Sequence, residues 1–222
     1  MKMAANLRAR EVLRAGDFLP GRLVMERGSA RDYSELERFH YVRERPATWA
    51  GVWRVVYVDC GLLNVDCCRE RLGLCASPQS TVNNQQSRTV AVGVLSWPLV
   101  TVHVRDELLG LGRGKSAAKI RFLNEHVRTI SRVIVHPQFR SLGLASRLVR
   151  RVCEDCSTRY VEAVAVMGRV HPFFERGGMK RVGECGSGEA YLLLDRDEWK
   201  NPGGRCALSR RLGIFNGKEV LS

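Results

Sequence analysis

Apolar and polar positions along this chain follow two periods, one typical of strands and one typical of helices. Runs rich in β-branched, leucine and aromatic residues predict strands at 51–59, 88–97, 129–137, 159–167, 179–184 and 189–196. Apolar spacings of three and four residues, with glycine as a terminator, predict helices at 35–41, 115–128, 144–156 and 171–178. This alternation indicates an α/β protein whose sheet is partly antiparallel.

The helix expected at 144–156 has an apolar face and a basic remainder. Its apolar face repeats every four residues at Leu144, Leu148, Val152 and Cys156. Its arginines are expected to lie away from that face: Arg147, Arg150 and Arg151. The preceding strand and turn then decide whether this stretch is more than a basic surface helix.

The turn before this helix has the features of an anion site. The strand ends at Pro137, and Gly143 stands immediately before the helix. A helix N-terminus presents unpaired backbone N–H groups and partial positive charge, and a glycine lets an anion approach the backbone. Arg140 adds a positive side chain. The stretch therefore predicts a site for a pyrophosphate group.

Two short motifs resemble those of one enzyme family. Residues 135–145 read V-H-P-Q-F-R-S-L-G-L-A and match V-x-P-x-x-(R/Q)-x-x-G-x-(G/A) without a gap. Residues 173–179, F-F-E-R-G-G-M, are similar to the F-Y-E-K-L-G-F helix that follows the fifth strand. Both motifs resemble those of the GNAT (Gcn5-related) N-acetyltransferases. The resemblance implies the GNAT acyl-CoA N-acyltransferase fold, a central mixed, mostly antiparallel sheet flanked by helices.

The resemblance also implies a co-substrate, acetyl-CoA, and no metal. Three residues at the strand edge would flank its acyl arm: Val133, Ile134 and Val135. The following turn and helix start would hold its pyrophosphate: Arg140, Ser141, Leu142, Gly143, Leu144, Ala145 and Ser146. The reaction implied is transfer of an acetyl group to a primary amine of a protein or small molecule, by direct attack on the thioester.

Glu162 is the candidate general base. It is the only acid inside the apolar strand Y-V-E-A-V-A-V, where an unpaired carboxylate would be costly. An alternative stays open, in which Glu162 is a structural partner of one of the many arginines. Ser131, with Thr129, lies on the strand leading to the motif and is a candidate for relaying a proton through water.

The sequence departs from the family at two positions. Phe174 stands where the helix tyrosine of the family often serves as general acid, and Met167 replaces a frequent asparagine. Loss of a general acid typically costs about 10²–10⁴ in rate. These replacements leave open a non-catalytic acyl-CoA-binding module.

Family members line the acceptor site from the first helix and the loop after it. In this sequence that region, 38–49, is dense in aromatic and basic residues. Arg43, Arg45 and Trp49 are therefore expected to contact the acceptor, with core packing as the alternative for Trp49.

Charge and hydropathy limit the classes of partner. The net charge of +13 favours a phosphate-bearing cofactor, RNA or an acidic protein surface, so an RNA-directed acetyltransferase or an RNA-binding protein is the alternative function. No stretch approaches the ~18 apolar residues of a membrane helix, so no membrane partner is expected. The N-terminus lacks an apolar signal core, which favours a cytoplasmic protein. A homodimer is left open.

The expected organisation has three parts. Residues 1–30 form an extension with a short amphipathic helix, 31–199 the GNAT domain with a polar insertion at 60–87, and 200–222 a peripheral tail. The eight cysteines read as reduced thiols. Structural zinc at Cys153, Cys156 and the three cysteines of 67–75 is a minor alternative, because no second pair at zinc-finger spacing and no nearby histidine accompany them.

Overall fold

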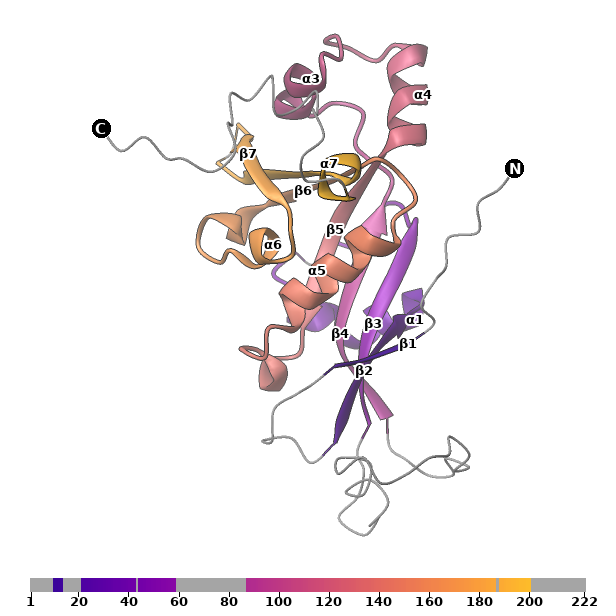
Figure 1. Cartoon of the computed structure of the whole chain (residues 1–222), viewed down its shortest axis with the longest axis vertical. Helices are drawn as coiled ribbons and strands as arrows, with labels where there is room; N and C mark the ends of the chain where they lie inside the picture. Colours follow the sequence, from indigo (N-terminus) through magenta and orange to yellow (C-terminus); the bar gives the residue numbers. More distant parts are fainter. Residues whose placement is uncertain (1–9, 14–20, 43, 59–86, 187, 201–222) are drawn as a thin grey trace.

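One mixed sheet organises the chain (Figure 1). A computed structural model describes residues 10–13, 21–42, 44–58, 87–186 and 188–200. Within these residues the sheet has eight strands in the order β1-β2-β3-β4-β5-β6-β8-β7. The strands are β1 (Arg10–Leu13), β2 (Arg22–Arg27), β3 (Gly51–Val58), β4 (Ser87–Ser96), β5 (Val127–Val135), β6 (Tyr160–Ala165), β7 (Lys180–Glu184) and β8 (Ala190–Asp195). Every pair of neighbours is antiparallel except β5 and β6, which are parallel.

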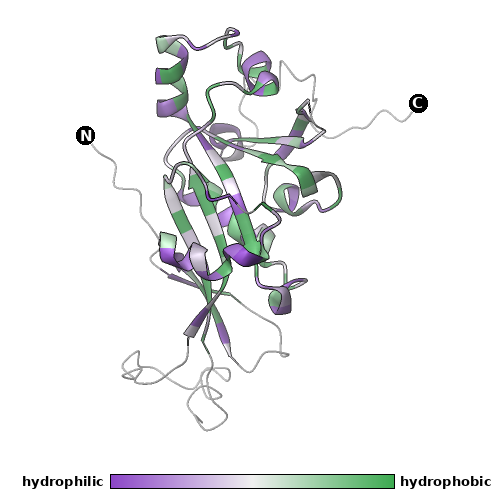
Figure 2. Ribbon diagram, turned by 180° about the vertical axis from the view of Figure 1, so that it is seen from behind, coloured by the Kyte–Doolittle hydropathy of each residue, from purple (hydrophilic) through white to green (hydrophobic). Residues whose placement is uncertain are grey.

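Helices cover both faces of the sheet. Helix α5 (Leu144–Asp155) crosses one face (Figure 1), and α1 (Ala30–Leu36) lies on the other, which Figure 2 shows from behind. The remaining helices and 3₁₀ turns are η1 (Glu37–Phe39), α3 (His103–Leu109), α4 (Ala117–His126), η2 (Pro137–Phe139), η3 (Val166–Arg169), α6 (Phe173–Arg176) and α7 (Arg196–Lys200). The expected mixed, mostly antiparallel sheet flanked by helices is confirmed.

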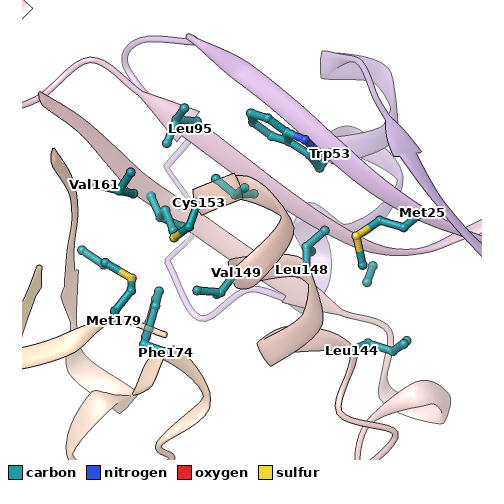
Figure 3. Close-up of a cluster of buried hydrophobic side chains, with 14 of the residues drawn as sticks. Met25, Trp53, Leu95, Leu144, Leu148, Val149, Cys153, Val161, Phe174 and Met179 are labelled. Carbon is teal, nitrogen blue, oxygen red and sulfur yellow. The ribbon is translucent and has the colours of Figure 1, made fainter. Parts of the chain in front are cut away.

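The main core lies between α5 and the sheet (Figure 3). The apolar face expected for the helix is confirmed, because Leu144, Leu148, Val152 and Cys156 are all buried there. Gly93 of β4 lets the helix approach closely, since a Cβ at that position would lie 3.1 Å from Leu148. Close packing of this kind fixes the helix, and with it the turn at its N-terminus, against the middle of the sheet.

The short helix expected at the start of the N-terminal extension is wrong for residues 10–13, which form β1. Residues 22–27, for which no element was expected, form β2, and β2 pairs with β1 and with β3. The physical reason is period two: Leu23 and Met25 point into the core while their neighbours alternate outward. The insertion at 60–87, apart from Ser87, and the tail after Lys200 lie outside the described residues.

Arg151 corrects a second expectation. Its side chain is 4% exposed rather than pointing away from the protein. It donates to Asp155 at 2.8 Å on its own helix and to Glu11 of β1 at 3.0 Å. The two carboxylates neutralise the buried guanidinium, so this arginine joins β1 to α5. Arg147 and Arg150 are exposed as expected.

The helix expected at 35–41 begins earlier. Helix α1 starts after Ser29, where Ser29 and Asp32 form a capping box, and a 3₁₀ turn follows it. Helix α3 was not predicted, because its sequence, H-V-R-D-E-L-L, has too few apolar positions for a period to stand out.

An ion-pair network joins α1 to β2 and β3. Arg54 donates to Glu26 and to Asp32, each at 2.6 Å. Burial alone would raise the pKa of Glu26, but hydrogen bonds from Arg54 and Arg10 outweigh burial and lower it. Burial would likewise raise the pKa of Asp32, but hydrogen bonds from Ser29 and Arg54 lower it.

We therefore expect stability to fall on acidification. A carboxyl group whose folded pKa is lowered stabilises the fold above its unfolded value, here 4.5 for Glu26 and 3.8 for Asp32, and this contribution is lost as pH falls through the folded pKa. Urea midpoints measured from pH 7 to pH 2.5 should drop steeply below pH 4.5, and Arg54→Met should flatten that drop. If the urea midpoint fell equally steeply with pH in the wild type and in the Arg54→Met variant, this role of the network would be contradicted.

Candidate functional site

Strands β5 and β6 separate after a short stretch of pairing. Their parallel register ends at Thr129, which pairs with Glu162, although β5 continues to Val135. At the same place the pairing of β5 with β4 skips one residue, because Leu95 opposes Ile130 and Val94 opposes Arg132. The skipped residue, Ser131, forms a β-bulge, and a bulge bends and twists its strand. The bulge thus opens a wedge between β5 and β6.

The edge of β5 that faces the wedge carries backbone hydrogen-bonding groups. The N–H of His136 donates to Val90 of β4 at 2.8 Å. Because successive backbone groups point to alternate edges of a strand, those of Val133 and Val135 face the opposite edge, where β6 has diverged. Ile134 is buried, whereas Val133 and Val135 are half-buried. The three strand residues expected from sequence therefore line one side of the wedge.

The turn after β5 presents a helix N-terminus beside the wedge. Ser141 and Gly143 both adopt left-handed backbone, with φ of 69° and 71°. A Cβ on Gly143 would meet nothing within 4 Å, so glycine is favoured there by conformation rather than by space. Among the described residues no side chain caps this end of α5. Three N–H groups of the first turn consequently point outward: Leu144, Ala145 and Ser146.

Arg140 lies in the turn between β5 and α5. Its side chain is exposed, and its Nε donates to the carbonyl oxygen of Val135 at 3.4 Å. The structure thus brings the residues that the sequence assigned to the pyrophosphate, 140–146, beside those that it assigned to the acyl arm, 133–135. Positive charge, free N–H groups and the dipole of a twelve-residue helix favour phosphate oxygens there.

Glu162 lies at the point where the wedge begins. Its side chain is 1% exposed, and both carboxylate oxygens are bonded. Thr129 donates to Oε1 at 2.7 Å, and Tyr191 donates to Oε2 at 2.7 Å. Nη1 of Arg105 lies 3.1 Å from Oε1 and 3.4 Å from Oε2. The arginine partner that the sequence left as an alternative is therefore present.

Arg105 begins a buried ladder of charges that extends from Glu162 to α4. Its Nη2 donates to the carbonyl oxygens of Leu99 and Val100 and to Asp106 at 3.3 Å. Asp106 in turn accepts from Nζ of Lys119 at 2.6 Å. These charged side chains are at most 9% exposed. Two cations and two anions alternate, so the ladder is neutral and holds α3 and α4 against the end of the sheet.

No local pattern in the sequence marks Arg105 as a site residue. It is one of many arginines, and it lies in a helix without a clear period, 57 residues before its partner Glu162.

Burial beside Glu162 raises the pKa of Tyr191 for two reasons: desolvation of its hydroxyl and the adjacent charge of Glu162. Tyr191 therefore remains a hydrogen-bond donor to Glu162.

Ser131 belongs to a second polar cluster beside the first. Its Oγ lies 2.6 Å from Oγ of Ser96 on β4. The Ser96 hydroxyl also donates to the carbonyl oxygen of Thr48 at 2.7 Å. Ser96 is the cross-strand partner of Thr129, so both clusters lie on one face of the sheet. The opposite neighbours, Leu95 and Ile130, pack in the core under α5.

The residues expected to contact the acceptor make different contacts in the structure. Trp49 adjoins Thr48 and packs edge-on against Tyr33, with ring centroids 5.3 Å apart. Arg45 is exposed and donates to Glu37 at 3.0 Å. Arg43 lies outside the described residues. Contact of these residues with an acceptor stays a prediction.

Phe174 is a core residue. It is 5% exposed, and it packs in the α5 core near Val149 and Met179 (Figure 3). Met167, by contrast, is 41% exposed at η3. No phenol stands at the position of the usual general acid of the family.

Within the described ranges, metal-binding groups and membrane-spanning helices are both absent. No group of three or more potential ligand side chains that could hold a metal ion occurs there. Cys153 and Cys156 are buried, and burial strongly raises the pKa of the Cys153 thiol. The other cysteines considered for zinc, at 67–75, lie outside those ranges. No helix among the described residues is long and apolar enough to cross a membrane.

Comparison with known protein families gives one match. Residues 84–179 match the model of the acetyltransferase (GNAT) family. These residues belong to the GNAT family. The matched segment runs from β4 through α6 and so includes the bulge, the wedge and the turn before α5. The matched segment accordingly has a GNAT fold and supports an enzyme of the acyltransferase type.

Similar solved structures were found at low identity. They include a KacTA–DNA complex (11% identity, 82% of this chain and 98% of that chain), NAA60 of Arabidopsis thaliana with acetyl-CoA (13%, 77% and 96%) and an agmatine N-acetyltransferase mutant without ligand (14%, 78% and 99%), each with a TM-score of 0.42. Because these scores are below 0.5, the GNAT assignment rests on the family match and the strand geometry. A search of curated proteins found no significant match.

The charge ladder predicts a specific stability pattern. Arg105→Met should lower the free energy of unfolding by about 3–5 kcal/mol, because it leaves the buried carboxylate of Glu162 without its cation. Arg105→Met/Glu162→Gln should recover most of this loss, since no buried charge is then unpaired at that end. Urea unfolding measures the free energies of unfolding of the single and the double variant. Arg113→Met, which replaces an exposed arginine of the same segment, is the control. A double variant less stable than the single one would contradict the ladder.

Proposed function

We propose that this protein is an acetyl-CoA-dependent N-acetyltransferase that acetylates a primary amine of a protein or small molecule. The observation that carries the proposal is the wedge at Ser131, which opens toward the uncapped N-terminus of α5. One side of the wedge offers a strand edge and its end offers an anion site. An extended thioester arm that ends in a pyrophosphate has the complementary shape and charge.

Each part of acetyl-CoA has a proposed partner. The backbone edge at Val133–Val135 pairs with the amide groups of the acyl arm. The N–H groups at Ser141–Ser146 and the guanidinium of Arg140 hold the pyrophosphate. A backbone N–H near the bulge stabilises the oxyanion that forms when the thioester carbonyl is attacked.

The proposed chemistry is direct attack by a neutral amine. The amine must lose a proton as the N–C bond forms, and Glu162 accepts that proton through the Thr129 hydroxyl that already donates to it. Phe174 supplies no proton to the departing sulfur. A thiolate with a pKa near ~8.5 leaves without one, so catalysis does not require the tyrosine that this chain lacks.

Gly143 provides the test of the anion site. Gly143→Asp and Gly143→Asn introduce side chains of equal size that tolerate left-handed backbone similarly, so the pair differs mainly in charge. Titration calorimetry with acetyl-CoA should show binding by wild type, binding by the Asn variant within about tenfold, and a loss of more than about 100-fold with Asp. If the two variants bound acetyl-CoA with equal affinity, the pyrophosphate would not bind at this turn.

The role of Glu162 as general base is tested together with Arg105→Met, because the double variant leaves no buried charge unpaired and is expected to stay folded. The variant Arg105→Met/Glu162→Gln retains shape and polarity around Thr129 but has no carboxylate to accept a proton. We expect kcat to fall by about 10²–10⁴ while the Kd for acetyl-CoA is unchanged. The acceptor is the amine that wild type turns over fastest among a peptide with a free α-amino group, a lysine peptide and 1,4-diaminobutane. Unchanged kcat in the double variant would exclude Glu162 as the base.

A further inference from the structure

Arg132 is a half-buried cation on the side of the sheet that faces away from α5. Its cross-strand partner is Val94. Val94 packs under α1, and so does Ile134, two residues further along β5. Cross-strand partners and residues two apart share a face of a sheet, so the Arg132 side chain lies on the face that α1 covers (Figure 2). The Glu162 and Ser131 clusters lie on that same face.

The segment that follows α1 lies against the guanidinium of Arg132. Nη2 donates to the carbonyl oxygen of Glu44 at 2.9 Å, and Nη1 donates to the carbonyl oxygen of Ser131 at 2.7 Å. Burial of the His40 ring lowers its pKa, and the charge of Arg132 lowers it further. Arg132 is therefore placed between the bulge of β5 and the segment from which the acceptor is expected to be bound.

The charge of Arg132 is not balanced within the described part of the chain. Both of its hydrogen bonds go to neutral carbonyl oxygens, and no carboxylate there forms an ion pair with it. A cation that is partly withdrawn from water without a counter-charge is costly. Three other arginines on this side of the sheet have acidic partners: Arg54 with Glu26 and Asp32, Arg45 with Glu37, and Arg105 with Glu162.

Arg132 also has donors to spare. A guanidinium carries five N–H groups, and the two bonds to carbonyl oxygens use two of them. Its Nε is buried and has no partner among the described residues, whereas the bond of Nη2 to Glu44 lies at the surface. A ligand that approaches this end meets one positive charge and a planar fork of donors.

A carboxylate matches these properties. Its two oxygens accept parallel N–H bonds from a guanidinium, and its single negative charge balances the single positive charge. A phosphate monoester carries about −1.5 to −2 at pH 7 and would bring more charge than Arg132 neutralises. The ligand that fits here is therefore a carboxylate.

We infer that Arg132 binds a carboxylate group of the acceptor, so that the protein selects amines that also carry an acidic group. This inference rests on the proposed function. Thr129, which bonds to the proposed base, precedes Arg132 by three residues, which is about 10 Å along a strand. The amine and the carboxylate of the acceptor are accordingly separated by several bonds. A long ω-amino acid and a peptide with an acidic residue near its amino end both have this form, whereas a diamine would place a second cation against Arg132.

Matched acceptors test the role of the carboxylate. One pair is 6-aminohexanoate and 6-aminohexanamide, and the other is a peptide with a free α-amino group and glutamate at its third residue, beside the same peptide with glutamine. Wild type should prefer the acidic member by at least about tenfold in kcat/KM. A preference in the first pair identifies a small-molecule acceptor, and a preference in the second identifies a peptide. Equal kcat/KM within both pairs would overturn the inference.

Substitution of Arg132 separates recognition from a structural role. Arg132→Gln should lower kcat/KM for the acidic member to that of its amide and leave the amide unchanged. Arg132→Lys should keep part of the preference, because it keeps the charge but not the fork. Arg121→Gln, which replaces an exposed arginine of α4, is the control and should keep all of it. Full preference in Arg132→Gln, or an equal loss for both members, would contradict the assignment.

Calorimetry distinguishes failure of this inference from failure of the proposed function. Arg132→Gln should bind acetyl-CoA as wild type does, because the wedge and the turn before α5 are unchanged. A wild type that binds acetyl-CoA and acetylates both members of each pair equally refutes the role of Arg132 alone. A wild type that binds no acetyl-CoA refutes the function itself and the inference with it.

Discussion

The β-bulge at Ser131 is the constraint on which the site depends. It ends the alignment of β5 with its neighbours, so β5 stays paired with β4 while it parts from β6. The exposed backbone edge and the polar residues at the start of the wedge lie at that one extra residue, and the uncapped end of α5 follows at the end of the same strand. Without it β5 and β6 would continue as an ordinary parallel pair and would have no room for a ligand.

Burial of charge holds the acceptor side of the site together. The carboxylate of Glu162 would be costly inside the sheet, and Arg105, Thr129 and Tyr191 compensate it from three other elements. The same contacts orient the Thr129 hydroxyl and fasten α3 beside the wedge. Stability and chemistry therefore share one network, so a test of function must use variants that keep its charges balanced.

The sequence predicted the parts of the fold that have strong periods or a motif. The strand from 129, the turn with Gly143 and the apolar face of α5 were recognisable because apolar spacing and glycine chemistry are local. The strands near the N-terminus were missed because short runs of arginine and glutamate mask period two. Arg105 and the burial of Arg151 depend on partners far along the chain, and no local pattern reports them.

Amide hydrogen exchange, with and without acetyl-CoA, tests the central claim most directly. If the wedge and the turn bind the thioester arm and its pyrophosphate, exchange should slow at 131–135 and at 141–146 on addition of acetyl-CoA, with α1 and β7 unchanged. Gly143→Asp should lose this protection, and Gly143→Asn should keep it. Protection that appears elsewhere on the sheet, or at none of these residues, would contradict the account.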